Sequence, residues 1–292
     1  MPRRALSASR ASDLLNFLAA HPGRSYTYSQ LARNLGINLA SAHSLLVALC
    51  ECGFLVRDAA DRSYELGPAL VAIGDAALER NPIIDEARPR MRALSRALEL
   101  ETLAFVKVGA DTLCVARAGP DQPPGMTARV GQRIPLMAPL APVFVAWAPP
   151  EEVESWLLRG GVTRKKRAEQ QSHLVGVRER GYSVAVEVAG RRRIGELLSE
   201  LADDPHSKTL RGEIHDQIHE LGHGEFRLPA GRRRNYPIYG ITAPVFDPRG
   251  QVALSITLQG YPRNLSLRAL EDYAKKLQDL TTKIGDAVQP RR

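Results

Sequence analysis

The sequence predicts an α+β protein of two domains, and three observations support this. Two short stretches with apolar residues at helical spacing flank Gly36, a pattern typical of a helix–turn–helix. Two strand-like runs, 54–57 and 63–66, follow and predict a β-hairpin. Farther along, paired strand-like runs alternate with amphipathic segments, which predicts an antiparallel sheet with helices packed against it. The 292 residues suffice for two domains, each with its own core.

The stretch 29–53 is the most informative in the chain. One apolar stripe ends just before Gly36, and a second begins at Ala42 with i, i+3, i+4, i+7 spacing. Gly36 tolerates the positive φ that the turn between the helices requires. A helical stretch at 13–20 precedes this unit, and the hairpin follows it as a wing. The order predicts a winged helix–turn–helix over residues 1–66, whose second helix enters the DNA major groove. An ordinary helical hairpin is the alternative.

Charge and composition narrow the class of partner. The net charge of +8 fits an anionic partner, although proteins that bind no nucleic acid also reach it. No segment is long and apolar enough for a membrane span, and the N-terminus lacks the apolar core of a signal peptide. We therefore expect a cytoplasmic protein with no membrane partner. Residues 2–10 suggest a flexible basic arm. The three cysteines fit a reducing compartment and are most simply buried or half-buried packing residues.

Longer motifs follow the wing in a distinctive order. They read LGPALVAIGDAAL, VGQRIPL, VRERGYSV and ITAPVFDPRGQVALSITL. With them the chain resembles the IclR family of bacterial transcription regulators over residues 10–188 and 236–287. The resemblance implies a linker helix at 67–81 and a GAF-like effector-binding domain at 82–292. It also implies a homodimer, or a dimer of dimers, on double-stranded operator DNA.

The second helix of the helix–turn–helix is poor in basic residues. The resemblance implies a proline and a basic residue at its start and an arginine after its histidine. Here Asn38, Leu39 and Ser44 occupy those positions, while His43 is retained. Bidentate recognition of guanine by arginine is therefore absent from this helix, and surrounding arginines are expected to contact phosphates. The predicted DNA-binding residues are Arg33, Asn38, Ala40, Ser41, His43, Ser44, Val47, Arg57 and Arg62.

The resemblance also implies an effector pocket between the sheet and the loop after VGQRIPL. That loop, MAPLAPVFVAW, is apolar where the family often carries histidine, serine or threonine, and a Gly-Lys pair. The usual acidic residue is Ala185 and the usual cysteine is Gly240. An apolar lining favours a hydrophobic organic acid or thioester, whether aromatic, lipid-like or steroid-like, over a two- or three-carbon oxoacid. A closed core without a pocket is the alternative. The predicted effector-binding residues are Leu140, Ala141, Ala185, Gly240, Ser255 and Thr257.

Residues 189–235 do not match the family pattern and form an insertion between two strands. Two apolar stripes predict a pair of helices, compatible with a lid over the pocket or with an oligomer contact. His215, His219 and His223 are spaced by four, which suits a transition metal such as zinc. An exposed polar face is the simpler interpretation, because neither cysteine nor an HExxH pattern accompanies them.

The sequence therefore predicts a sequence-specific DNA-binding regulator that responds to a small organic acid. Nucleophile-elbow, phosphate-loop and dinucleotide patterns are absent, so we expect no catalytic residues, no enzyme activity and no cofactor. Two alternatives remain open. One is a metal-responsive DNA-binding regulator that uses the histidines of the insertion, and the other is a metal-dependent enzyme fused to a DNA-binding module.

Overall fold

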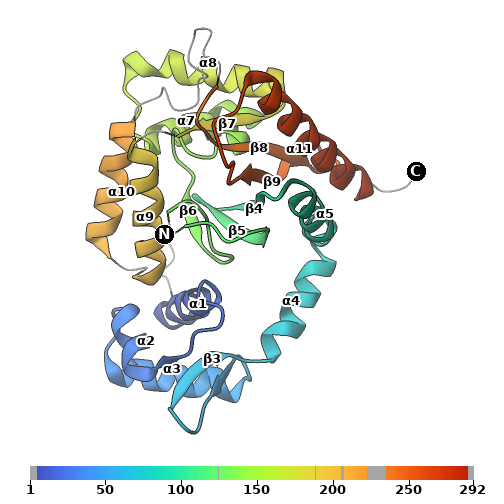
Figure 1. Ribbon diagram of the computed structural model, residues 1–292. Helices are drawn as coiled ribbons and strands as arrows, with labels where there is room; N and C mark the ends of the chain where they lie inside the picture. Colours follow the sequence, from blue (N-terminus) through green and yellow to red (C-terminus); the bar gives the residue numbers. More distant parts are fainter. Residues whose placement is uncertain (1–4, 124, 188, 205–206, 222–234, 289–292) are drawn as a thin grey trace.

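The computed structural model describes residues 5–123, 125–187, 189–204, 207–221 and 235–288. A small N-terminal unit and a larger C-terminal unit are joined through α4 (Ala69–Glu79) and α5 (Pro82–Leu98). The two units also meet at a second place, where His21, just after α1, contacts Asp203 at the end of the insertion helix α9 (Figure 1). Within the described ranges, no helix is long and apolar enough to cross a membrane.

The N-terminal unit is a winged helix–turn–helix, as predicted. Its apolar stripes bury Leu31, Leu46 and their neighbours, and Gly36 turns the chain at a φ of 60°. Its helices and strands are α1 (Leu6–Ala19), β1 (Tyr26–Thr27), α2 (Tyr28–Asn34), α3 (Leu39–Glu51), β2 (Leu55–Arg57) and β3 (Ser63–Leu66), with strand order β1-β3-β2.

Two expectations for this unit are wrong. The first helix begins at Leu6, so most of the predicted arm 2–10 is helical. The helical part, residues 6–10, has no proline or glycine to oppose a helix. Its one large apolar residue, Leu6, is exposed, so no apolar stripe marks this turn of the helix in the sequence. Cys52 is exposed, because α3 ends there and the residue forms its C-cap.

Cys114, in the C-terminal unit, is buried, and burial raises the pKa of its thiol to about 12, so this thiol stays protonated at neutral pH.

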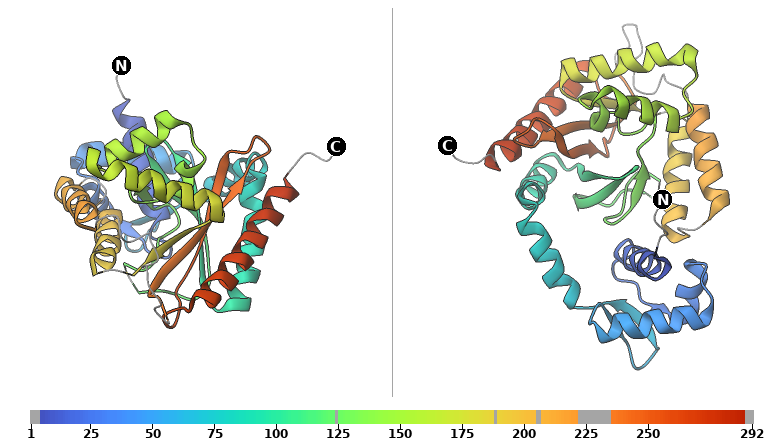
Figure 2. Two further views of the ribbon diagram at one scale, coloured as in Figure 1. Left: turned by 90° about the horizontal axis from the view of Figure 1, so that it is seen from above. Right: turned by 180° about the vertical axis from the view of Figure 1, so that it is seen from behind.

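The C-terminal unit contains a six-stranded antiparallel sheet of order β6-β5-β4-β9-β8-β7. Helix α5 and the long α11 (Leu267–Ala287) pack on one face, and α6, α7 and α8 cover the other (Figure 2). The strands are β4 (Glu101–Val108), β5 (Asp111–Ala118), β6 (Arg133–Pro135), β7 (Ser183–Val186), β8 (Ile238–Phe246) and β9 (Val252–Gln259); these three helices are α6 (Val143–Ala146), α7 (Pro150–Arg159) and α8 (Arg164–Arg180). The predicted α+β class is confirmed, and α5 continues through Pro89.

The insertion forms two adjacent helices, α9 (Ala189–Asp203) and α10 (Lys208–Leu221). Their apolar stripes bury Ile194, Leu197 and Ile214 against Met137 and Leu140 of the loop after β6. From sequence, the apolar character of that loop predicts pocket lining, with packing in a closed core as the alternative. Met137 does not line the cavity described below, so the pocket prediction is wrong for this residue, which belongs to the cluster that docks the insertion.

Candidate DNA-binding face and ligand cavity

The solvent-facing side of α3 carries five of the nine predicted DNA-contacting residues, and the other four lie on α2, at the start of α3 and in the wing. Burial of Ala42, Leu46 and Leu49 fixes the rotation of the helix and directs the opposite side outward. Of the nine predicted residues, eight are exposed and Ser41 is half-buried. The structure therefore places them on an accessible surface. Their contact with DNA stays a prediction.

Local hydrogen bonds limit what two of these residues can offer to DNA. The Asn38 side chain caps α3, with its Oδ1 accepting from the Ser41 backbone N–H at 2.8 Å. Its amide N–H2 group is therefore the part that can extend to a phosphate. The Ser44 hydroxyl donates to the Ala40 carbonyl oxygen at 3.2 Å, so toward a base edge it acts as an acceptor. His43 lies edge-on to Tyr28, with ring centroids 6.4 Å apart.

The wing brings two arginines to the surface. Arg57 ends β2 and lies over the Tyr64 ring, with its Cζ 5.8 Å from the ring centroid. Arg62 occupies the hairpin turn with a φ of 60° and is exposed. Asp58 accepts hydrogen bonds within the same turn, including one from the Ala60 N–H at 2.6 Å. The Asp58 carboxylate thus stabilises the turn, while the two arginines extend from its stem and tip.

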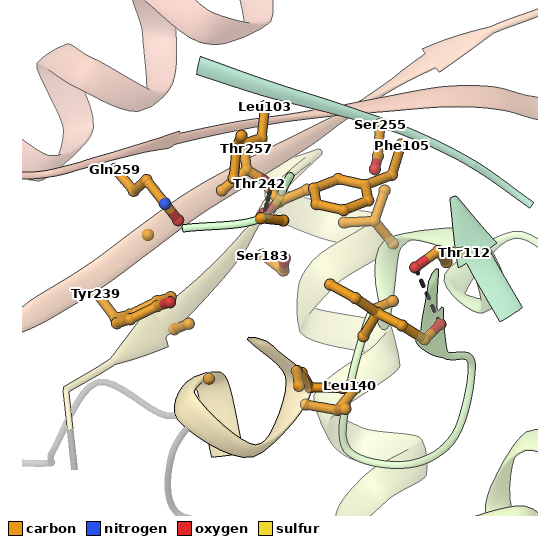
Figure 3. A pocket seen from close by; sticks show the side chains of 18 of the residues that line it. Leu103, Phe105, Thr112, Leu140, Ser183, Tyr239, Thr242, Ser255, Thr257 and Gln259 are labelled. Carbon is orange, nitrogen blue, oxygen red and sulfur yellow. Dashed lines mark hydrogen bonds between the residues drawn. The ribbon is translucent and has the colours of Figure 1, made fainter. Parts of the chain in front are cut away.

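A cavity of about 160 Å³ lies between the sheet, the loop before α6 and helix α9 (Figure 3). All six predicted effector residues line it, so the structure brings together positions that are far apart in sequence. The alternative of a closed core without a cavity is wrong. Most of the wall is apolar, with Leu103, Phe105 and Val143 among its side chains. That these residues bind an effector stays a prediction.

Half of the polar side chains that line the cavity come from β8 and β9. The Thr242 and Thr257 hydroxyls are hydrogen-bonded at 2.8 Å across these paired strands, and Gln259 and Tyr239 lie nearer one end (Figure 3). Several of these residues were not predicted from sequence. Gln259 could have been, because residues at alternate positions share one face of a strand and Ser255 and Thr257 were already assigned to the cavity. The missed lining residues that carry polar groups are Thr112, Thr127, Gln132, Ser183, Arg191, Tyr239, Thr242 and Gln259.

Glu101 holds one end of the cavity together. Its carboxylate is fully buried and accepts from Thr127 Oγ1 at 2.6 Å and from Gln259 Nε2 at 2.7 Å. Arg117 Nε donates to the same carboxylate. Burial opposes the charge on Arg117, but its hydrogen bonds to Glu101 and Asp121 outweigh this effect and raise the pKa of Arg117. The carboxylate thus fixes two side chains of the cavity wall, Thr127 and Gln259.

The end of α9 contacts the DNA-binding unit through a small polar cluster. Asp203 accepts from His21 Nε2 and, at 2.8 Å, from Arg129 Nη1. Arg129 also donates to Ser199 Oγ at 3.2 Å, and His21 Nδ1 lies 2.6 Å from the Phe17 carbonyl oxygen. Burial tends to raise the pKa of Asp203, but the bonds from His21 and Arg129 prevail and lower it. The insertion therefore contacts both the cavity and the helix–turn–helix unit.

The predicted metal site is only partly within the described residues. His215 lies exposed on α10, whereas the side chain of His219 and all of His223 lie outside the described part of the chain. Among the residues that the structure does describe, no three His, Cys, Asp or Glu side chains are grouped as metal ligands.

A winged helix–turn–helix joined to a domain with a ligand-sized cavity defines the class of ligand-responsive transcription regulators. The chain belongs to the IclR family of bacterial transcriptional regulators. The profile of the IclR helix-turn-helix domain matches residues 7–59, and that of the bacterial transcriptional regulator IclR C-terminal domain matches residues 75–188. The second match stops just before the insertion helix α9.

Individual relatives agree with this assignment. The HTH-type transcriptional regulator KipR of Bacillus subtilis is 25% identical over 95% of this chain and 92% of its own length. The crystal structure of an IclR transcriptional regulator from Alicyclobacillus acidocaldarius superposes with a TM-score of 0.66 at 20% identity, covering 97% and 99% of the two chains. A homolog from Microbacterium hydrocarbonoxydans, complexed with 4-hydroxybenzoate, gives 0.62 at 18% identity over 97% and 99%. The protein is a DNA-binding transcriptional regulator of the IclR type, and these findings do not support the metal-responsive alternative.

Proposed function

We propose that the protein binds operator DNA as a homodimer, or as a dimer of dimers, in the cytoplasm, and that a hydrophobic organic acid with a single ring controls this binding. It carries out no catalysis in this proposal. The observation that carries the ligand class is the cavity, with its apolar walls and its volume of about 160 Å³. An engineered apolar cavity of about 150 Å³ in another protein holds one benzene molecule. A steroid or an acyl thioester exceeds this volume, which narrows the range of ligands expected from sequence.

The 4-hydroxybenzoate in the Microbacterium homolog supports a one-ring acid, because it shows such a ligand on this fold. Calorimetric titration with benzoate, 4-hydroxybenzoate, pyruvate and glyoxylate tests the proposal directly. We expect binding of the ring acids and none of the oxoacids. Binding of the oxoacids alone would contradict the proposed ligand class.

Operator affinity is expected to depend steeply on salt. Helix α3 has no lysine or arginine, so phosphate contacts come from Arg33, Arg57 and Arg62 around it. Two such units neutralise about six phosphates, which predicts roughly a thousandfold loss of affinity between about 50 and 200 mM salt. Fluorescence anisotropy with an operator selected from random DNA measures this slope. The Arg57→Ala variant should flatten the slope and leave the preferred sequence unchanged. A nearly salt-independent affinity in the unmodified protein contradicts a phosphate-dominated interface.

Helix α4 provides the surface that we assign to a second copy of the chain. Its sequence, ALVAIGDAALE, is apolar on nearly all sides, yet none of its residues is buried, and Val71 and Ile73 are 65% and 51% exposed. A helix that is apolar all round is normally buried. A second copy fits here, because winged helices bind paired half-sites and α4 adjoins this unit.

The double substitution Val71→Asp/Ile73→Asp is expected to shift the protein from dimer to monomer in sedimentation velocity. The two carboxylates would lose their hydration in the dimer interface, and the free energy of this desolvation exceeds the stabilisation from the interface contacts. Leu158→Asp is the control, since Leu158 is equally apolar and 61% exposed but lies on α7. Loss of the dimer in the control, or its retention in the double variant, argues against α4 as the interface.

A further inference from the structure

The insertion contributes a cation to the cavity wall. Arg191 lies near the start of α9, and it is the one charged side chain among the described residues that line the cavity. Ile194 and Leu198 follow at i+3 and i+7 on the same helix and also line the cavity. The packing of this helical face therefore directs Arg191 toward the space that a ligand would occupy.

Tyr239 and the surrounding wall hold the Arg191 guanidinium in place. Its Cζ lies 4.6 Å from the centroid of the Tyr239 ring, within the range of a cation–π contact. Stacking uses the flat face of a guanidinium, whereas its five N–H donors lie in the plane and match a carboxylate. Burial lowers the pKa of Arg191, opposed by Tyr239 and by the charge of Glu187, but an arginine remains charged in proteins.

We infer that the guanidinium of Arg191 binds the carboxylate of the ligand, so that the insertion helix makes the cavity select acids over neutral rings. This inference rests on the proposed one-ring ligand. A carboxylate that enters an apolar cavity loses its hydration and needs an opposite charge. The positions where the family usually carries an acidic residue and a cysteine, Ala185 and Gly240, supply no charge here. Glu187 competes with the ligand for Arg191, so it tunes the affinity for acids.

Matched neutral and charged probes test the assignment. Calorimetry measures benzoate and benzamide binding to the unmodified protein and to Arg191→Met and Glu187→Gln. We expect the unmodified protein to prefer benzoate by about 10- to 100-fold, the range of a hydrogen bond to a charged group. Arg191→Met should lose this preference while still binding benzamide, which shows that the cavity remains folded. Glu187→Gln should tighten benzoate binding and leave benzamide binding unchanged.

The outcomes separate this inference from the proposed function. Equal affinity of the unmodified protein for benzoate and benzamide overturns the role of Arg191 but leaves a ring-sized cavity in place. Unchanged benzoate affinity in Arg191→Met does the same. If the unmodified protein binds neither probe, both the inference and the proposed one-ring ligand are wrong.

Discussion

The substitution Gly195→Ala is expected to abolish ligand binding in the cavity, whereas Gly212→Ala is expected to preserve it. A Cβ at residue 195 would overlap the carbonyl oxygen of Gly125 and come within 2.6 Å of its carbonyl carbon. Backbone atoms cannot rotate aside as a side chain does, so α9 must move away from the 125 loop. Because Arg191 and Ile194 line the cavity from the same helix, this movement takes them away from the ligand.

Gly212 provides the matched control for this experiment. It lies within α10, and a Cβ there would meet no atom within 4 Å. Both substitutions gain about 0.5–1 kcal/mol of helix propensity, so this gain cancels when the two variants are compared. Overpacking at residue 195 lowers the free energy of unfolding by about 1–3 kcal/mol. Calorimetry with benzoate and thermal unfolding measure the two effects, and equal benzoate affinity in the two variants would refute close docking of α9.

Glu101→Ala is expected to cost about 3 kcal/mol of folding free energy in the C-terminal unit. Removing one member of a buried ion pair costs about 3–5 kcal/mol, because the other charge stays behind uncompensated. The lower end applies, since the Arg117 side chain is 28% exposed and keeps Asp121 as a partner at 2.8 Å. Gln259 and Thr127 also lose an acceptor.

The measurement can be confined to one unit of the protein. Both tryptophans, Trp147 and Trp156, belong to the C-terminal unit, so tryptophan fluorescence during urea unfolding follows that unit. Asp121→Ala removes the 95% exposed partner of the same arginine, and we expect it to change the stability by less than about 1 kcal/mol. Similar destabilisation by both variants would show that the buried Glu101 carboxylate contributes no more to stability than the exposed Asp121 carboxylate.

The helix–turn–helix and the cavity strands were predictable because their signals are local. Gly36 between two apolar stripes and the alternation along β9 each depend on a few neighbouring residues. The position of Arg191 in the cavity wall was not evident from sequence, because it lies in a run of three arginines that resembles a solvated surface cluster. The helical period that predicts the buried face of α9 does extend back from Ile194 to Arg191. The helical period does not show which other element that face packs against.

The apolar loop after β6 shows the same limit. From sequence, Met137 and Leu140 were equally good as lining for a hydrophobic ligand and as packing for another element. Only the three-dimensional contacts show that both pack against α9 and α10, and that Leu140 alone also borders the cavity. Such a choice depends on long-range packing, which hydrophobic patterning does not encode.

Helix α9 borders the cavity between Arg191 and Leu198 and contacts the DNA-binding unit through Asp203 at its end. Its 15 residues span about 22 Å, so a single element bridges the two sites. A ligand that shifts α9 would therefore also change the His21–Asp203 contact, and the free energy of that change would contribute to ligand binding. Because such coupling is reciprocal, the proposed function implies that a bound operator would alter the affinity for the acid by the same factor as the acid alters the affinity for the operator. Under the proposed function, the concentration of acid at which the regulator responds would therefore depend partly on the operator it occupies, and two promoters with different operators would respond at different thresholds.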